Sequence, residues 1–261
     1  MARTQNFRKF NPYPPSKEIN PPMKTIAKYD SNCDAPTTPV RHRSTAAFTL
    51  IELMTVVAII AILAGVAMPG VASAVRQAQM NAAMQNAKQL STGLRSYASD
   101  YDGIFPGSVD LVTEEEYSNS NDAFRSLLPD YIDTERIFAV PGSSWGPRAD
   151  GRMDDESERL EAGENHWAYI AGLTTSSRSD WPLIVDGTNG SGTYTRRAGD
   201  KGGCWEGRKA VVIRVGGSAE TVPLVGDDEE RYLPRFGYPE QNALELDAYM
   251  GENVKLLEPA E

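Results

Sequence analysis

A single carboxylate in an otherwise apolar stretch is the residue of this sequence with the clearest chemical potential. Glu52 is the only charged residue from Phe48 to Val75. A carboxylate within a membrane-spanning segment costs roughly 2.5–3.5 kcal/mol on insertion scales, so it requires a partner or a position near the interface. A cation would suit as that partner, because opposite charges attract strongly at low dielectric constant. The alternative is that Glu52 lies at the interface and extends its side chain to water.

The stretch around Glu52 has the length and composition of a membrane helix. Residues 48–68 read FTLIELMTVVAIIAILAGVAM. About 20 apolar residues at ~1.5 Å per residue match a hydrocarbon layer of ~30 Å. The basic segment Arg41–Arg43 comes shortly before it. Because basic flanks stay on the cytoplasmic side, we expect the N-terminal side of the helix in the cytoplasm.

Signals for catalysis are weak. His166 is the only histidine after Ala47, which excludes two-histidine metal sites there and leaves one partner for a nucleophilic serine or cysteine. Its place at the start of a predicted strand favours a structural role. The sequence has no G-x-x-x-x-G-K-[ST] nucleotide loop. We therefore predict that the protein is not an enzyme and that no residue is catalytic.

Charge and cysteine content limit the partners. Of the 26 Lys/Arg and 36 Asp/Glu residues, residues 1–47 hold eight and three, so residues 48–261 carry a formal charge of −15. This acidity makes nucleic acid an unlikely ligand, because phosphate contacts need a positive surface. The two cysteines are Cys33 and Cys204. Without residues 1–47, no internal disulfide can form, and we expect Cys204 to be a small, partly buried residue.

Two acidic turns are the candidate calcium sites. Calcium prefers six to eight oxygen ligands from carboxylates and backbone carbonyls. Residues 186–190 (DGTNG) and 226–230 (GDDEE) offer such oxygens, but neither has EF-hand spacing. The expectation is that the protein needs no cofactor or metal, with calcium as the open alternative.

The sequence around Glu52 resembles a prepilin processing site. Ala47 is followed by Phe48-Thr-Leu-Ile-Glu52-Leu53 and an uninterrupted apolar helix, after a short basic approach. This pattern is similar to that of type IV pilins and type II secretion pseudopilins. The resemblance implies that a prepilin peptidase cuts between Ala47 and Phe48 and methylates the new amine of Phe48. It further implies that Glu52 pairs with the amine of a neighbouring subunit during assembly. The family usually has Gly before the cut, where this chain has Ala47.

The resemblance also implies a location and partners. The chain would be a single-pass inner-membrane protein with its head in the periplasm, and part of a periplasmic or extracellular filament after assembly. Its partners would be membrane lipid, other pilin or pseudopilin subunits, the prepilin peptidase, an assembly ATPase and an inner-membrane platform. Type IV pilus and type II secretion both remain open, as do major and minor subunit roles. The alternatives are a periplasmic binding or catalytic domain tethered by the helix, and a minor adhesin or DNA-uptake subunit.

The N-terminal part divides into a leader and a long helix. Residues 1–47 are rich in proline and lack a periodic apolar face, so we predict that they are disordered. The resemblance implies that they are a leader that is cleaved off, whose start could also be Met23. Residues 48–102 form the predicted helix, with 48–68 in the membrane and 71–101 amphipathic. Pro69 and Gly70 should weaken or kink the helix between these two parts. The amphipathic part has its apolar residues at helical spacing: Ala83, Ala87, Leu90, Leu94, Tyr97 and Tyr101.

Residues 103–261 form the predicted globular head. Gly103 is the expected helix stop, and Tyr97, Tyr101 and the Phe105-Pro106 pair resemble the helix end and head start of pseudopilins. Strands are predicted at 166–171, 182–185, 210–215 and 220–225, the last two as a hairpin. Helices are predicted at 121–128, capped by Asn121 or Asp122, and within 243–257. Residues 153–164 read as a charged surface loop. The predicted fold class is α+β, a long helix packed on an antiparallel sheet.

Overall fold

The computed structural model describes residues 48–107, 109, 116–146, 148–227, 230–251 and 253–261. Leu53–Glu261 form one compact unit of the chain. The predicted leader and Ala47 lie outside the described residues. The predicted domain boundary between residues 47 and 48 therefore stays a prediction.

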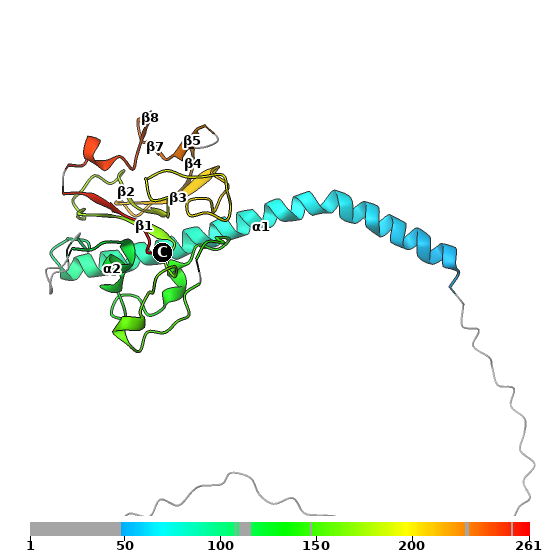
Figure 1. Ribbon diagram of the computed structural model, residues 1–261, viewed down its shortest axis with the longest axis horizontal. Helices are drawn as coiled ribbons and strands as arrows, with labels where there is room; N and C mark the ends of the chain where they lie inside the picture. The colour runs from blue at the N-terminus through cyan, green and yellow to red at the C-terminus, as the bar shows by residue number, and fades with distance from the viewer. Residues whose placement is uncertain (1–47, 108, 110–115, 147, 228–229, 252) are drawn as a thin grey trace, which may run out of the picture. The chain divides into compact units, whose positions relative to one another are not determined.

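The long helix is present as predicted. α1 (Leu50–Asp100) contains 51 residues and is drawn without a break from blue to green in Figure 1. Helical backbone continues through Pro69 and Gly70, so the described chain shows no helix break at this point. A proline removes one backbone donor, and the flanking turns keep their own hydrogen bonds. The predicted weakening or kink of the helix at this point stays a prediction.

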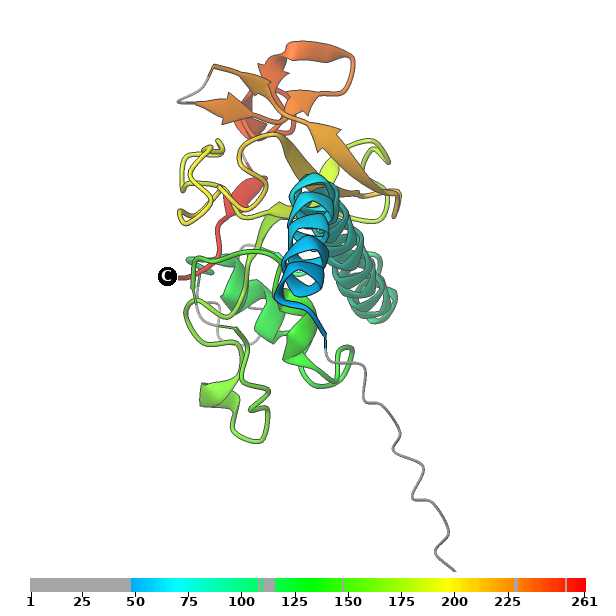
Figure 2. The ribbon, with the colours of Figure 1, turned by 90° about the vertical axis from the view of Figure 1, so that its right-hand side faces the viewer.

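The C-terminal half of α1 belongs to the core of the head. Burial begins at Met80, and the predicted stripe from Ala83 to Tyr97 is buried at each of its five positions. These side chains form one apolar cluster with those of the sheet, and Figure 2 shows the head gathered around this half of the helix. Tyr101 differs from the prediction because it is 42 % exposed. Its ring stacks on that of Tyr97 at the surface, with the ring centroids 4.2 Å apart.

The helix ends at the predicted glycine. Gly103 has a φ of +82°, a conformation that glycine adopts without strain. Its backbone N–H donates to the carbonyl of Ala98 at 2.7 Å, which closes the last turn. Phe105 follows and is fully buried. The buried Tyr169 hydroxyl donates to the carbonyl of Pro106 at 2.6 Å, so the aromatic-proline pair anchors the start of the head.

The sheet of the head is antiparallel and has five strands. Its spatial order is β4-β3-β2-β1-β9, and all four pairings are antiparallel. The strands are β1 (Trp167–Ala171), β2 (Pro182–Asp186), β3 (Lys209–Arg214), β4 (Ala219–Pro223) and β9 (Lys255–Leu257). β1 and β2 are buried along their whole length, as befits inner strands of β-branched and aromatic residues. The predicted α+β class is confirmed.

The predicted hairpin is formed by β3 and β4. Ile213 pairs with Ala219 across the turn at residues 214–218. Arg95 of α1 donates a hydrogen bond to the carbonyl of Val215 just after β3. The hairpin is thus tied directly to the long helix.

The C-terminal helix predicted within residues 243–257 is wrong. The region holds the short 3-10 helix η3 (Leu246–Ala248) and then strand β9, whose Leu256 pairs with Ile170 of β1. A three-residue strand is too short to show a periodicity of two. Its conformation is set by the free edge of β1, which lies far away in the sequence.

Short elements cover the sheet and α1. The helix predicted at 121–128 is shorter, and its cap is Asn119 rather than Asn121 or Asp122; the Asn119 side chain accepts from the N–H of Asp122 at 3.1 Å. The predicted surface loop 153–164 is exposed only in part, because Leu160 and Glu164 are buried. The remaining elements are α2 (Ser120–Arg125), η1 (Glu135–Phe138), η2 (Glu156–Glu158), β5 (Val225–Gly226), β6 (Arg231–Tyr232), β7 (Pro234–Arg235) and β8 (Tyr238–Asn242).

Candidate processing and assembly site

A reciprocal cap holds Glu52 at the start of α1. The backbone N–H and the hydroxyl of Thr49 both donate to the Glu52 carboxylate, at 2.9 and 2.8 Å. The N–H of Glu52 donates in return to the Thr49 hydroxyl at 3.3 Å. With the helix beginning at Leu50, Thr49 is the N-cap residue and Glu52 is the third helical residue. This is the arrangement of a capping box.

Sequence reasoning missed the cap, although the T-x-x-E spacing carries the signal. Glu52 thus has a local role that does not need a second subunit. The carboxylate also lies where the helix dipole favours negative charge. The bonds from Thr49 already fix the orientation of the carboxylate before a cation of a neighbouring chain approaches it.

The helix around this site presents its apolar side chains outward. Every described side chain of α1 from Leu53 to Ala78 is exposed. α1 is long and apolar enough to cross a membrane by length and composition. Such a continuous apolar surface marks a contact with lipid or with other chains. Phe48, the predicted new N-terminal residue, is 77 % exposed.

His166 and Cys204 show structural environments. His166 is buried, its Nδ1 accepts from the N–H of Val140 at 3.1 Å, and its ring packs against Trp145 with centroids 4.8 Å apart. Cys204 has a free thiol that is partly covered. Burial raises the pKa of this thiol, and the charge of nearby Asp186 adds to that effect, so the thiolate is disfavoured.

The two turns that are candidate calcium sites use several of their oxygens in hydrogen bonds within the chain. Asp186 is buried, and its carboxylate accepts from the N–H of Val211 at 2.8 Å. The Thr188 hydroxyl donates to Glu258. In the second turn, Asp227 accepts from the N–H of Glu230 at 2.9 Å, while residues 228 and 229 lie outside the described residues. Among the described residues, neither turn gathers three carboxylates.

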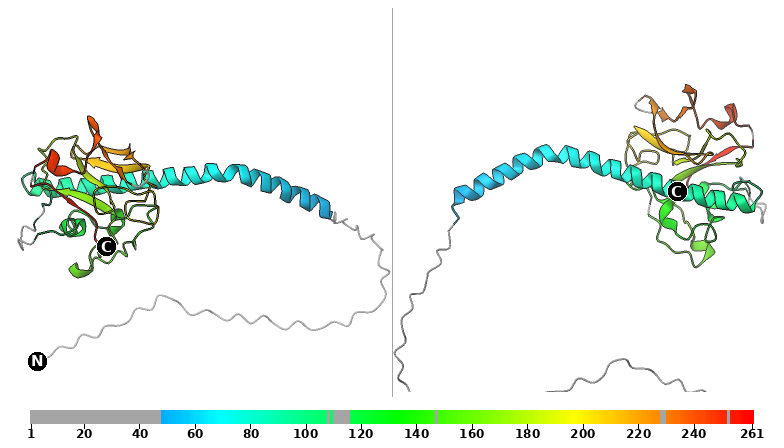
Figure 3. Two further views of the ribbon diagram at one scale, coloured as in Figure 1. Left: turned by 45° about the horizontal axis from the view of Figure 1, so that its top comes forward. Right: turned by 180° about the vertical axis from the view of Figure 1, so that it is seen from behind.

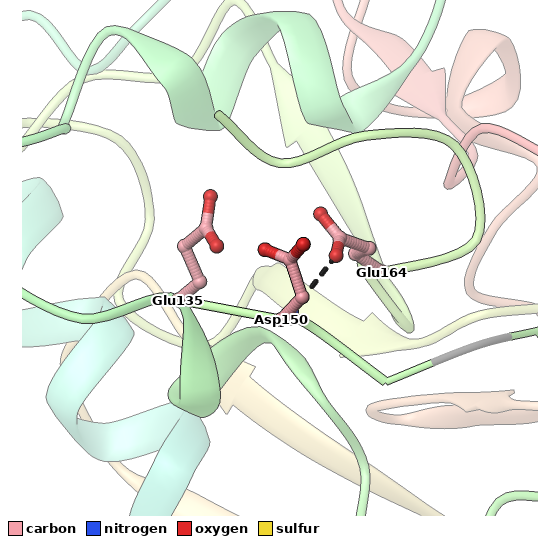
Figure 4. Close-up of side chains that lie close together, drawn as sticks. All are labelled: Glu135, Asp150 and Glu164. Atoms are coloured by element: carbon pink, nitrogen blue, oxygen red, sulfur yellow. Dashed lines mark hydrogen bonds between the residues drawn. The ribbon is translucent and has the colours of Figure 1, made fainter. Parts of the chain in front are cut away.

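A different acidic trio does come together. One carboxylate oxygen from each of Glu135, Asp150 and Glu164 lies within 4.8 Å of the others, and Figure 4 shows the three side chains converging from separate segments. Glu135 and Glu164 are buried, whereas Asp150 is exposed. Burial raises the pKa of Glu135, and the charge of Glu164 adds to that effect.

Backbone donors already occupy the buried members of this trio. Glu135 accepts from the N–H groups of Leu160 at 2.6 Å and Gly151 at 3.2 Å. Glu164 accepts from those of Asp150 at 2.9 Å and Glu161 at 2.8 Å. The trio therefore fixes the loop of residues 150–164 against η1. Sequence reasoning could not find it, because its members come from three separate segments.

Comparison with known proteins identifies the N-terminal segment. Residues 42–68 match the family model described as the prokaryotic N-terminal methylation motif. No curated protein and no solved structure matches the chain. Residues 42–68 therefore carry the signature of type IV pilins and pseudopilins, on a chain whose long helix and antiparallel sheet have the pilin-like α+β architecture.

Proposed function

We propose that this chain is the precursor of a structural filament subunit rather than an enzyme. A prepilin peptidase cuts between Ala47 and Phe48 and methylates the new amine. α1 anchors the product in the inner membrane with the head in the periplasm. An assembly ATPase and a membrane platform then insert it into a type IV pilus or a type II secretion pseudopilus.

One observation carries this proposal. The exposed half of α1 is apolar from Leu53 to Val75 and is preceded by a single carboxylate, Glu52. In a bundle of such helices, apolar side chains pack against one another and each Glu52 finds the Phe48 amine of a neighbour. Leaving either charge alone in a low-dielectric layer is costly, so the pair favours association and fixes the register.

Variants at the cap separate the two roles of Glu52. Glu52→Gln removes the charge, but glutamine still accepts within a capping box. Thr49→Ala removes the hydroxyl and keeps the charge. The measurement is the fraction of the chain in sheared, pelleted filaments, with the membrane fraction as the control for insertion.

We expect Glu52→Gln to insert into the membrane. Its fraction in the filaments should fall more than about tenfold, because removing one partner of a buried charge pair costs several kcal/mol. The filament fraction of Thr49→Ala should remain close to that of the unsubstituted chain. Normal incorporation of Glu52→Gln would overturn the pairing.

A further inference from the structure

The hairpin of β7 and β8 carries an exposed aromatic tip. Phe236 and Tyr238 are 70 % and 52 % exposed. Among the described residues from 103 onward, the other exposed large hydrophobic side chains are the aliphatic Ile104 and Val109. The hairpin therefore presents aromatic area to solvent where the rest of the described head does not. We refer to Arg235, Phe236 and Tyr238 as the hairpin tip.

Arg235 at this tip is rigidly held and lacks a carboxylate partner. Its guanidinium carbon lies 3.8 Å from the ring centroid of Tyr249 and 4.9 Å from that of Tyr238. Its Nη1 donates to the neutral Gln241 side chain at 2.9 Å. Within the described part of the chain, no Asp or Glu forms an ion pair with it. The stacked guanidinium is thus pre-organised, with donors left for a carboxylate.

The neighbouring arginines are already neutralised. Arg178 forms a two-point contact with Asp180, at 3.0 and 2.9 Å. Arg214 pairs with Glu220. The positive charge available at the tip is therefore that of Arg235. Arginine and exposed aromatic residues are also the residue types that dominate binding energy at protein interfaces.

An acidic loop at η2 has the complementary chemistry. We define it as residues 154–158, which read DDESE. Asp154 and Glu156 are exposed, and neither they nor Glu158 forms an ion pair within the described residues. Asp155 differs, because its carboxylate accepts from the N–H of Ser157 at 3.0 Å. The loop thus offers three carboxylates without cationic partners on a surface that is free in the single chain.

The two surfaces lie on opposite sides of the head. Figure 2 shows the orange hairpin at one end and the yellow-green loop of η2 at the other, and Figure 3 agrees from a second direction. They cannot meet within one chain. A contact between two different surfaces of identical chains repeats from one copy to the next. Unless the rotation between copies closes the assembly into a ring, this repeat builds an open filament.

We infer that the hairpin tip of one copy docks on the acidic loop of the next copy. This inference rests on the proposed filament function and adds a head-to-head contact to the packing of the helices. Arg235 donates to the carboxylates of Asp154 and Glu156, and Phe236 supplies the apolar contact beside them. The formal charge of −15 on residues 48–261 makes neighbouring copies repel, so a local opposite charge sets their register.

Cysteine crosslinking in the full chain tests the contact. Glu240→Cys beside the hairpin tip and Ser157→Cys in the acidic loop are made singly and together, and host cells are treated with a short bismaleimide. Both positions are exposed, and neither side chain is assigned a role in the contact. The unsubstituted chain controls for Cys33 and Cys204. Glu240→Cys combined with Asp133→Cys is the matched control and should give no ladder, since Asp133 is exposed but lies outside the acidic loop. The double variant at the contact should give a ladder of dimers, trimers and larger species, while each single variant should remain monomeric.

Charge exchange gives a second readout. Arg235→Glu or Glu156→Arg alone should lower the filament fraction about twofold to fivefold, as expected for an exposed charge pair. The two together should restore it, because the attraction is re-formed with the signs exchanged.

Each of the other possible outcomes of these experiments would overturn the inference. Dimers from Glu240→Cys alone would show a two-fold contact and overturn the inference. A missing ladder or a failed charge rescue, with the chain still present in filaments, would overturn the contact and leave the proposed function standing. Absence of the unsubstituted chain from filaments would overturn both.

Discussion

At the scale of single residues, Glu52 has a local role, to which we add a proposed intermolecular one. It closes a capping box with Thr49 and is the one carboxylate of the apolar segment. The charge could be recognised from the sequence because it interrupts an apolar run. The acidic trio could not, because Glu135, Asp150 and Glu164 meet only through the fold.

A buried carboxyl predicts how stability depends on pH. Burial raises the pKa of Asp186 to about 8, against an ordinary value of 3.8. The folded chain thus binds a proton here that the unfolded chain releases between these values. Stability from this group is complete below about pH 4 and falls as the pH rises to about 8. The expected slope is at most about 1.4 kcal/mol per pH unit.

Urea unfolding of the detergent-solubilised chain between pH 5 and 8 checks this dependence. Asp186→Asn resembles the protonated carboxyl and still accepts from Val211, so it should flatten most of the slope. Burial also raises the pKa of Glu258 and Glu135, and these groups account for a remainder of the same sign. Stability that increases toward pH 8 in the unsubstituted chain would contradict the account.

At the scale of elements, long periodic segments were predictable and short ones were not. The stripe from Ala83 to Tyr97 and the β-branched run of β3 carry their own periodicity, so sequence alone located them. β9 depends on its pairing with a strand that is distant in the sequence. The cap of α2 depends on a single side chain. The helical backbone continues through Pro69, and the weakening or kink expected there stays a prediction.

Close packing of α1 predicts the effect of one glycine. A Cβ at Gly93 would lie 2.6 Å from Cγ1 of Ile132, whereas a Cβ at Gly65 would meet nothing within 4 Å. Gly93→Ala should destabilise the head by about 1–2 kcal/mol, because overpacking outweighs the gain of about 1 kcal/mol in helix propensity. Gly65→Ala is the matched control and should not destabilise. Urea midpoints compare the two; equal or higher stability of Gly93→Ala would refute the packing argument.

At the scale of the whole molecule, hydrogen bonds within the head engage the carboxylates that could bind an ion. Glu135 and Glu164 of the trio, and Asp186 and Asp227 of the candidate turns, accept from backbone N–H groups. We therefore expect the melting temperature of the full chain to be the same in millimolar calcium and in EDTA. An increase of several degrees with calcium would show that these oxygens form an ion site.

The proposed filament role depends on processing, and the intact mass and N-terminal sequence of the protein recovered from host membranes measure that processing directly. We predict a chain that starts at N-methylated Phe48 and lacks residues 1–47. Cells without the prepilin peptidase are the control and should retain the precursor. Residues 1–47 still attached in cells with active peptidase would contradict the account and favour a head domain that α1 merely tethers to the membrane.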